Sequence, residues 1–265
     1  MLLLVGGAGA QEADVLFVVL GKMSLYTQDV EGSITLRDHH FVAEIMPKAG
    51  GTILAGTLSS RDDPTDRYVF ASEGEAFLAH GGRFDVPAKL HTAHPDGEYV
   101  FSYETASGRM DAQVLELSKR ASIGDVLDAA TITLTQSGRP VRADAIDPSV
   151  DLEVRWTVAR EMTRNPESVV DDLTFVLAFD CFGNRIAHSG RPFQEGSFLT
   201  YRDDRFLIEA DALSSGLRYS LIVEQATADA AIHEGVPGIA TYATLTFLDL
   251  ETIGEAKESC PVESP

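Results

Sequence analysis

Short apolar segments bounded by turn residues make up most of this chain after Asp14. They are rich in Val, Ile, Phe, Tyr, Leu and Thr, and Gly, Pro, Asp or Ser separates them, which is typical of strands and their turns. Long helical periodicity is absent, and only residues 87–93 and 123–127 suit short helices. The sequence therefore predicts an all-β fold. The predicted strands span residues 15–21, 23–27, 40–46, 52–59, 98–104, 113–118, 131–135, 152–158, 173–179, 185–188, 205–209, 218–224 and 240–250.

The length of 265 residues suits one large domain or two ordinary ones, at about 100–200 residues each. A polar, charged stretch near residues 120–130 separates two sets of predicted strands, and each half is large enough for one sandwich to bury its own core. We therefore expect two β-sandwich domains. Residues 11–120 would form the first, residues 121–250 the second, and residues 251–265 a polar acidic tail.

The charge of the chain restricts its partners. There are 41 Asp and Glu residues against 21 Lys and Arg residues, which gives a formal charge of −20. Such a negative field repels phosphate backbones and anionic lipid headgroups. The chain also has no run of 18 apolar residues, which is the length that a membrane-spanning helix needs. We expect no nucleic acid and no membrane insertion, which leaves a protein or polysaccharide surface as the expected partner.

The first ten residues have the pattern of a truncated signal peptide. The apolar Met1–Val5 stretch precedes small residues, and Ala8 and Ala10 form the A-x-A pattern that signal peptidase cleaves, just before Gln11. The alternative is a frayed N-terminus or a first edge strand, and the three glycines of this stretch disfavour the strand. We interpret residues 1–10 as a signal-peptide remnant and expect a protein that is secreted or held in the cell envelope.

The two cysteines, Cys181 and Cys260, are an even number in an expected oxidising compartment. A bond between them would tie the tail to the second half of the chain. The alternative is one buried thiol and one thiol in the tail, and sequence alone does not distinguish the two.

Two motifs of the second half resemble the fibronectin type III domain, an immunoglobulin-like sandwich. The segment Asp151-Leu-Glu-Val-Arg-Trp156 alternates apolar and polar residues and ends in a large indole, like an early core strand of that family. The segment from Leu213 to Val223 places a Leu, a Gly turn and Tyr219 ahead of an alternating strand. The resemblance implies that Trp156 fills the core and that the Tyr219 hydroxyl bonds back to the upstream backbone, although Ser215 replaces the usual Pro.

The whole chain also resembles an uncharacterised group of exported bacterial two-domain β-proteins. The segment that carries the resemblance is Pro95-Asp-Gly-Glu-Tyr-Val-Phe101, a tight turn followed by a strand. The resemblance implies an extracellular β-sandwich architecture. It brings no activity, because a fold does not determine a function.

Two groups of residues are candidate metal ligands. Asp62, Asp63 and Asp66 lie in one loop, and loop carboxylates with backbone carbonyls are the oxygen ligands that calcium takes. His91 and His94 lie close together before a predicted strand and could contribute imidazole ligands to a divalent ion. The alternatives are a solvated acidic surface and ordinary loop histidines. We therefore assign no cofactor and name calcium as the ion that the acidic loop would take.

Sequence motifs of catalysis are absent, among them G-x-S-x-G, H-E-x-x-H, the phosphate-binding glycine loop and C-x-x-C. The predicted function is a secreted, non-catalytic binding, adhesion or cell-envelope structural module. The alternative is an exported, glycosidase-like hydrolase with carboxylates in the cleft between the domains. A deep polar cleft with two facing carboxylates would favour the enzyme. A tyrosine-bearing surface or an exposed sheet edge would favour the binding module.

Overall fold

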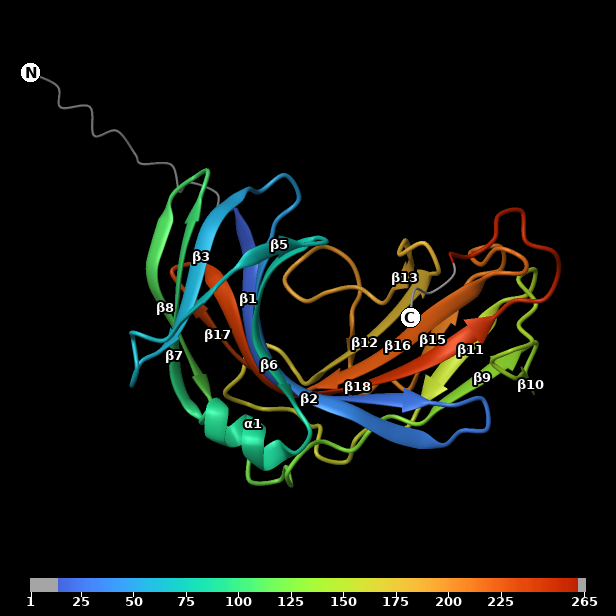
Figure 1. Cartoon of the computed structure of the whole chain (residues 1–265), viewed down its shortest axis with the longest axis horizontal. Helices are drawn as coiled ribbons and strands as arrows, with labels where there is room; N and C mark the ends of the chain where they lie inside the picture. The colour runs from blue at the N-terminus through green and yellow to red at the C-terminus, as the bar shows by residue number, and fades with distance from the viewer. Residues whose placement is uncertain (1–13, 262–265) are drawn as a thin grey trace, which may run out of the picture.

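A ten-stranded central sheet organises the computed structural model, which describes residues 14–261 (Figure 1). Eight of its strands follow the spatial order β13-β12-β16-β18-β1-β2-β6-β5, while β14 pairs with β12 and β17 pairs with β18. The bounds are β1 (Val15–Gln28), β2 (Ile34–Pro47), β5 (Ala71–Glu73), β6 (Ala76–Phe84), β12 (Leu173–Asp180), β13 (Arg185–His188), β14 (Leu199–Thr200), β16 (Arg218–Ala226), β17 (Asp229–His233) and β18 (Val236–Glu251).

Two four-stranded sheets pack on the central sheet, one on each half. The first has the order β4-β3-β7-β8 and the second the order β10-β9-β11-β15. Their strands are β3 (Ile53–Ser60), β4 (Arg67–Val69), β7 (Gly97–Thr105), β8 (Arg109–Leu117), β9 (Ile132–Gln136), β10 (Arg139–Pro140), β11 (Leu152–Trp156) and β15 (Arg205–Ile208). The helix is α1 (Pro87–Ala93), which precedes β7. The fold is all-β and contains two sandwiches, as the sequence predicts.

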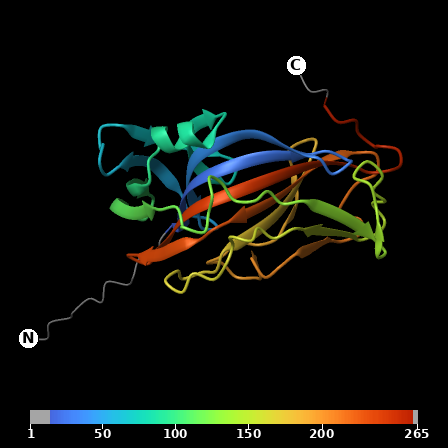
Figure 2. The ribbon, with the colours of Figure 1, turned by 90° about the horizontal axis from the view of Figure 1, so that it is seen from below.

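The long strands β1, β2 and β18 run through both sandwiches (Figure 2). The chain's first and last strands lie side by side, because β1 pairs in parallel with β18 from Val18 opposite Gly238 to Gln28 opposite Leu248. These strands bend near their middle, so the central sheet is concave on one side (Figure 1). The domain boundary expected near residue 120 stays a prediction, since the two cores share one continuous sheet.

Each sandwich has its own hydrophobic core, and alternation along the strands places both cores on the same face of the central sheet. In the first core, Leu20 of β1 and Phe41 of β2 pack with Phe101 of β7. In the second, Val176 of β12 and Leu221 of β16 pack with residues of the β9-β11-β15 sheet. The neighbouring side chains on the long strands therefore point to the opposite, concave face.

Among residues 14–261 no sheet covers the concave face, which is partly covered by the segment between β13 and β14. Phe193 of this segment packs against Phe17 of β1, with ring centroids 6.1 Å apart. Gly21 lies on the same face of β1, where a Cβ atom would come within 2.7 Å of the Thr241 side chain on β18. The close approach explains why glycine suits the part of the sheet that bends.

The predicted helix over residues 87–93 matches α1 in both bounds, whereas the one over 123–127 is wrong. The spacing of Ile123 and Leu127 is that of two residues on one helical face. In the structure they belong to an irregular segment, and their side chains, only 4% and 1% exposed, are buried in the first core. The predicted signal-peptide remnant, residues 1–10, lies outside the described residues.

Candidate binding pocket on the concave face

A cavity of about 210 Å³ opens on the concave face, between the two arms of the bent sheet. One wall is formed by β1 and β2 and includes Phe17, Val19 and Met46. The other is formed by β12 and includes Leu173 and Phe175. The volume equals that of about seven molecules of liquid water. The cavity can therefore hold a small ligand or a single side chain against apolar walls.

Two carboxylates, Glu44 of β2 and Glu224 of β16, line this cavity. Burial raises the pKa of Glu44 to about 7, opposed by the charge of Arg191. Burial also raises the pKa of Glu224 to about 7, and the negative charge of Glu44 adds to this rise. Within residues 14–261 neither carboxylate has a hydrogen-bond or ion-pair partner. Near neutral pH the pair therefore exchanges protons and can become doubly negative.

The basic groups beside the cavity are already engaged. Arg191 donates from Nη2 to Oε2 of Glu75 at 3.0 Å. The backbone N–H of Gly190 donates to Nδ1 of His188 at 2.9 Å, and burial together with the charge of Arg191 lowers the pKa of His188 to about 4. His188 is therefore neutral at pH 7. Within the described chain, the ionisable groups of the cavity that remain without a partner are therefore the two carboxylates.

A larger and more open hollow, of about 620 Å³, lies near Arg120 and Asp229. Arg120 donates to Asp172 at 2.8 Å and to Asp229 at 2.9 Å, and Asp172 also accepts the backbone N–H groups of Thr163 and Ala228. Arg120, Asp172 and Asp229 therefore satisfy one another. The other charged residues that line the hollow are Glu116, Arg164 and Glu167, which are exposed to solvent, whereas Glu44 and Glu224 of the smaller cavity are partly buried.

The predicted calcium ligands lie in the exposed loop between β3 and β4. Asp63 accepts the backbone N–H of Thr65 at 3.1 Å and its hydroxyl at 2.6 Å, and Asp66 accepts the hydroxyl of Tyr68 at 3.4 Å. Asp62 is exposed beside them. Asp63 thus bonds within its own loop, and Asp66 bonds to the adjoining strand β4.

His91 and His94 face different surroundings at the end of α1. Nδ1 of His91 lies 3.2 Å from the Nζ of Lys22. The His94 ring stacks on Phe41 with 4.0 Å between centroids, and its Nε2 bonds the carbonyl oxygen of Gly81 at 2.7 Å. In the part of the chain that the structure describes, no three His, Cys, Asp or Glu side chains form a group that could hold a metal ion.

Lys22 is a buried charged residue that the sequence analysis did not identify. Its side chain is 1% exposed, and Nζ donates to Oδ1 of Asp96 at 2.6 Å and to the hydroxyl of Tyr242 at 3.3 Å. Burial lowers the pKa of Lys22, while the contact with Asp96 opposes this change. The cluster lies on the core side of the sheet, away from Glu44, and links β1 and β18 to the turn before β7.

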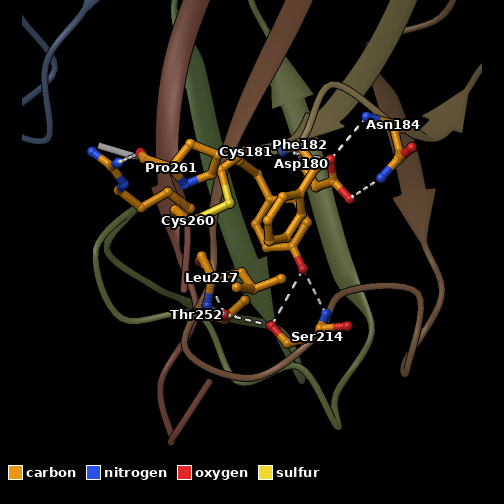
Figure 3. The surroundings of a disulfide bond; sticks show 11 residues. Asp180, Cys181, Phe182, Asn184, Ser214, Leu217, Thr252, Cys260 and Pro261 are labelled. Atoms are coloured by element: carbon orange, nitrogen blue, oxygen red, sulfur yellow. Dashed lines mark hydrogen bonds between the residues drawn. A yellow bond between two sulfur atoms is a disulfide. The ribbon is translucent and has the colours of Figure 1, made fainter. Parts of the chain in front are cut away.

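Trp156 and Tyr219 belong to the second core. Trp156 ends β11 and is 4% exposed. The Tyr219 hydroxyl accepts the backbone N–H of Ser214 at 2.6 Å and donates to the Ser214 carbonyl oxygen at 3.3 Å (Figure 3). These bonds fix the loop that leads into β16.

A disulfide joins Cys181, in the turn after β12, to Cys260 in the C-terminal segment (Figure 3). The same segment is held where Arg218 donates to the carbonyl oxygen of Pro261 at 3.5 Å. The turn is stabilised by Asp180, which accepts the backbone N–H of Phe182 at 2.9 Å. The segment after β18 is thereby fastened to the second sandwich.

Sequence reasoning missed Glu44 and Glu224. Glu44 lies between the apolar residues Ala43 and Ile45, and Glu224 directly follows the apolar segment Leu221–Val223. A charged residue in such a segment is a detectable signal, because it must either face solvent or be buried at a cost. That both face one cavity depends on the bend of the sheet, which residue patterns do not reveal.

Comparisons with known proteins place the chain in no family, since no family model and no curated protein matches it. Among solved structures, it is similar to one titled "Biofilm associated protein - BSP domain", with a TM-score of 0.22 and 12% identity. That match covers 89% of this chain and 30% of the other. The chicken CNTN1 FN1–FN3 domains match with a TM-score of 0.22 and 10% identity, over 88% of this chain and 68% of the other. In residues 14–261, no helix is long and apolar enough to cross a membrane.

Proposed function

We propose that this chain is an extracellular, non-catalytic binding module and that its binding site is the cavity on the concave face. The observation that carries the proposal is the pair of partnerless carboxylates, Glu44 and Glu224, in a cavity with apolar walls. Two half-buried acids that lack partners within residues 14–261 reduce the stability of the folded chain when they are charged. A cost of this kind is typical of a functional site.

Two features support a location outside the cell or in its envelope. The A-x-A pattern of residues 1–10 has the form of a signal-peptide end. The disulfide between Cys181 and Cys260 belongs to the chemistry of an oxidising compartment. A module of this kind would engage a protein or polysaccharide surface, adhering to it or contributing to envelope structure.

A second candidate function is an exported hydrolase that uses Glu44 and Glu224 as its acid and base. The pKa values of about 7 favour it, because a general acid must hold its proton near neutral pH. The cavity walls oppose a glycoside as substrate. Phe17, Phe175 and Met46 offer no hydrogen bonds to sugar hydroxyl groups.

The two candidates differ in turnover and in what fills the cavity. The experiment compares wild-type protein with Val19→Trp, which fills the cavity, and with Val69→Trp, a matched change on β4 at a side chain 72% exposed. Each protein is tested by thermal shift with small amines, carboxylates, alcohols and sugars, and for turnover of chromogenic glycosides and esters.

A binding module gives a rise in melting temperature with at least one ligand class that Val19→Trp loses and Val69→Trp retains, without turnover. Turnover that Glu44→Gln or Glu224→Gln abolishes would replace the proposal with the hydrolase. The proposal also fails if none of the four ligand classes gives a shift that depends on the cavity.

A further inference from the structure

We infer that the cavity binds a primary alkylammonium group, with the ammonium at the carboxylates of Glu44 and Glu224 and the alkyl chain against the apolar walls. This inference rests on the proposed function and names the ligand chemistry of the same site. It follows from the charge, the volume and the polar groups of the cavity.

The charge of the cavity selects a cation. Arg191 is bonded to Glu75, and the Nδ1 atom of His188 accepts a backbone N–H, so the two carboxylates are the charged groups left for a ligand. An anion would add a third negative charge at close range. A neutral ligand would displace the water that hydrates Glu44 and Glu224 and would bring no positive charge to compensate for the lost hydration. A cation replaces that hydration with charge-assisted hydrogen bonds.

The volume selects a small cation with an apolar chain. About 210 Å³ accommodates a chain of four or five carbon atoms and its ammonium group, about the size of a lysine side chain. Phe17, Val19 and Phe175 offer that chain an apolar surface. A bare metal ion would leave this surface unused.

An ammonium group suits this cavity because its three N–H donors point in different directions and can bond to a carboxylate from either side. Glu44 of β2 and Glu224 of β16 reach the cavity from different strands of the sheet.

Two sources share this chemistry, a free alkylamine and the lysine side chain of a partner protein. The experiment therefore titrates n-butylammonium, n-butanol and butyrate, and separately Nα-acetyl-lysine N-methylamide, into the full chain at pH 8.5. Calorimetry measures the dissociation constants. Wild-type protein is compared with the double variant Glu44→Gln/Glu224→Gln, with Val19→Trp, and with Glu104→Gln, a matched change at an exposed position on β7.

We expect n-butylammonium to bind at least about ten-fold more tightly than n-butanol, because it adds a charge-assisted interaction with the carboxylates. The double variant should bind both ligands equally, and Glu104→Gln should behave as wild type. The double variant removes acids that are costly to bury, so a loss of binding does not reflect unfolding. Binding of the lysine derivative would identify a partner's side chain as the ligand, and binding of n-butylammonium alone would identify a free amine.

The pH dependence provides an independent readout. The groups that face the ligand are Glu44 on β2, Glu224 on β16, and His188 and Arg191 on and after β13. Between pH 5.5 and 8.5 only the two carboxylates change charge, because the pKa of His188 lies near 4 and an arginine stays charged. We expect affinity for n-butylammonium to rise at least about ten-fold over this range.

The inference is overturned if n-butanol or butyrate binds as tightly as n-butylammonium, or if the double variant retains wild-type affinity. If n-butanol or butyrate binds in this way and Val19→Trp abolishes that binding, the inferred ligand class is wrong and the proposed function remains intact. If Val19→Trp affects no ligand, the inference and the proposed function both fail.

Discussion

Replacing Glu224 with glutamine should remove a large part of the pH dependence of folding stability. In the folded chain the pKa of Glu224 is raised to about 7, from 4.5 in a solvated glutamate. The folded state therefore keeps a proton that the unfolded state releases as the pH rises above 4.5. The stability of the folded state that depends on this proton is fully present below pH 4.5 and is lost as the pH rises through 7.

The magnitude follows from the difference between these two pKa values. At about 1.4 kcal/mol for each pH unit, the single carboxylate lowers the free energy of unfolding by about 3 kcal/mol between pH 4.5 and 8. Glu224→Gln keeps the shape of the side chain and cannot ionise. Its stability should therefore fall by about 3 kcal/mol less than that of wild type over the same range.

Urea unfolding at several pH values, followed by the fluorescence of Trp156, measures this difference, because the chain has one Trp. The difference between variant and wild type cancels the groups that do not interact with Glu224, among them His188, which acts in the opposite direction. Glu104→Gln on β7 is the matched control at an exposed position. Parallel stability curves for wild type and Glu224→Gln would refute the idea that the cavity holds a protonated carboxylate.

Three further changes test the second sandwich. Trp156→Ala should lower the free energy of unfolding by about 3–5 kcal/mol through lost burial and the cavity left behind, and a wild-type melting temperature would contradict the core position of the indole. Tyr219→Phe should cost about 0.5–1.5 kcal/mol in denaturant titrations, because it removes the bonds to Ser214, and equal stability would show that they contribute nothing. Replacing Cys181 and Cys260 with serine should lower the free energy of unfolding by roughly 4 kcal/mol, on the chain-entropy model for a separation of 79 residues. Denaturant titration measures this loss, and a wild-type mass two hydrogens below the reduced value verifies that the disulfide is present.

Much of the fold could be predicted because the local signals agree with the tertiary structure. The alternating segment before Trp156 is a strand with one buried face, and β13 has the predicted bounds Arg185–His188. β6 was missed, because Gly81 and Gly82 interrupt its pattern at a place where the chain packs closely on Phe41 and His94. Residues 15–21 and 23–27 were predicted as two strands but form one, β1, because Lys22 finds its partners inside the fold.

The candidate site was less accessible to sequence reasoning. Local patterns identify residues that are unusual for their segment, such as Glu44 and Glu224. They do not identify which of the 41 acidic residues meet, because that depends on strand order and on the bend of the sheet. The acidic loop at Asp62, Asp63 and Asp66 is more conspicuous in the sequence, and its carboxylates bond locally.

The pairing of β1 with β18 has a consequence for how the chain folds. More than 200 residues separate the partners Val18 and Gly238, so this central ladder can form only after most of the chain has been synthesised. Val236, Ala240 and Tyr242 of β18 belong to the core of the first sandwich, which is therefore incomplete until the last strand docks. Contacts of such high sequence separation slow folding, and the open edge of β1 exposes the unfinished sheet to aggregation meanwhile. We expect slow refolding without an early, stable N-terminal intermediate, because the first core is completed only by the last strand.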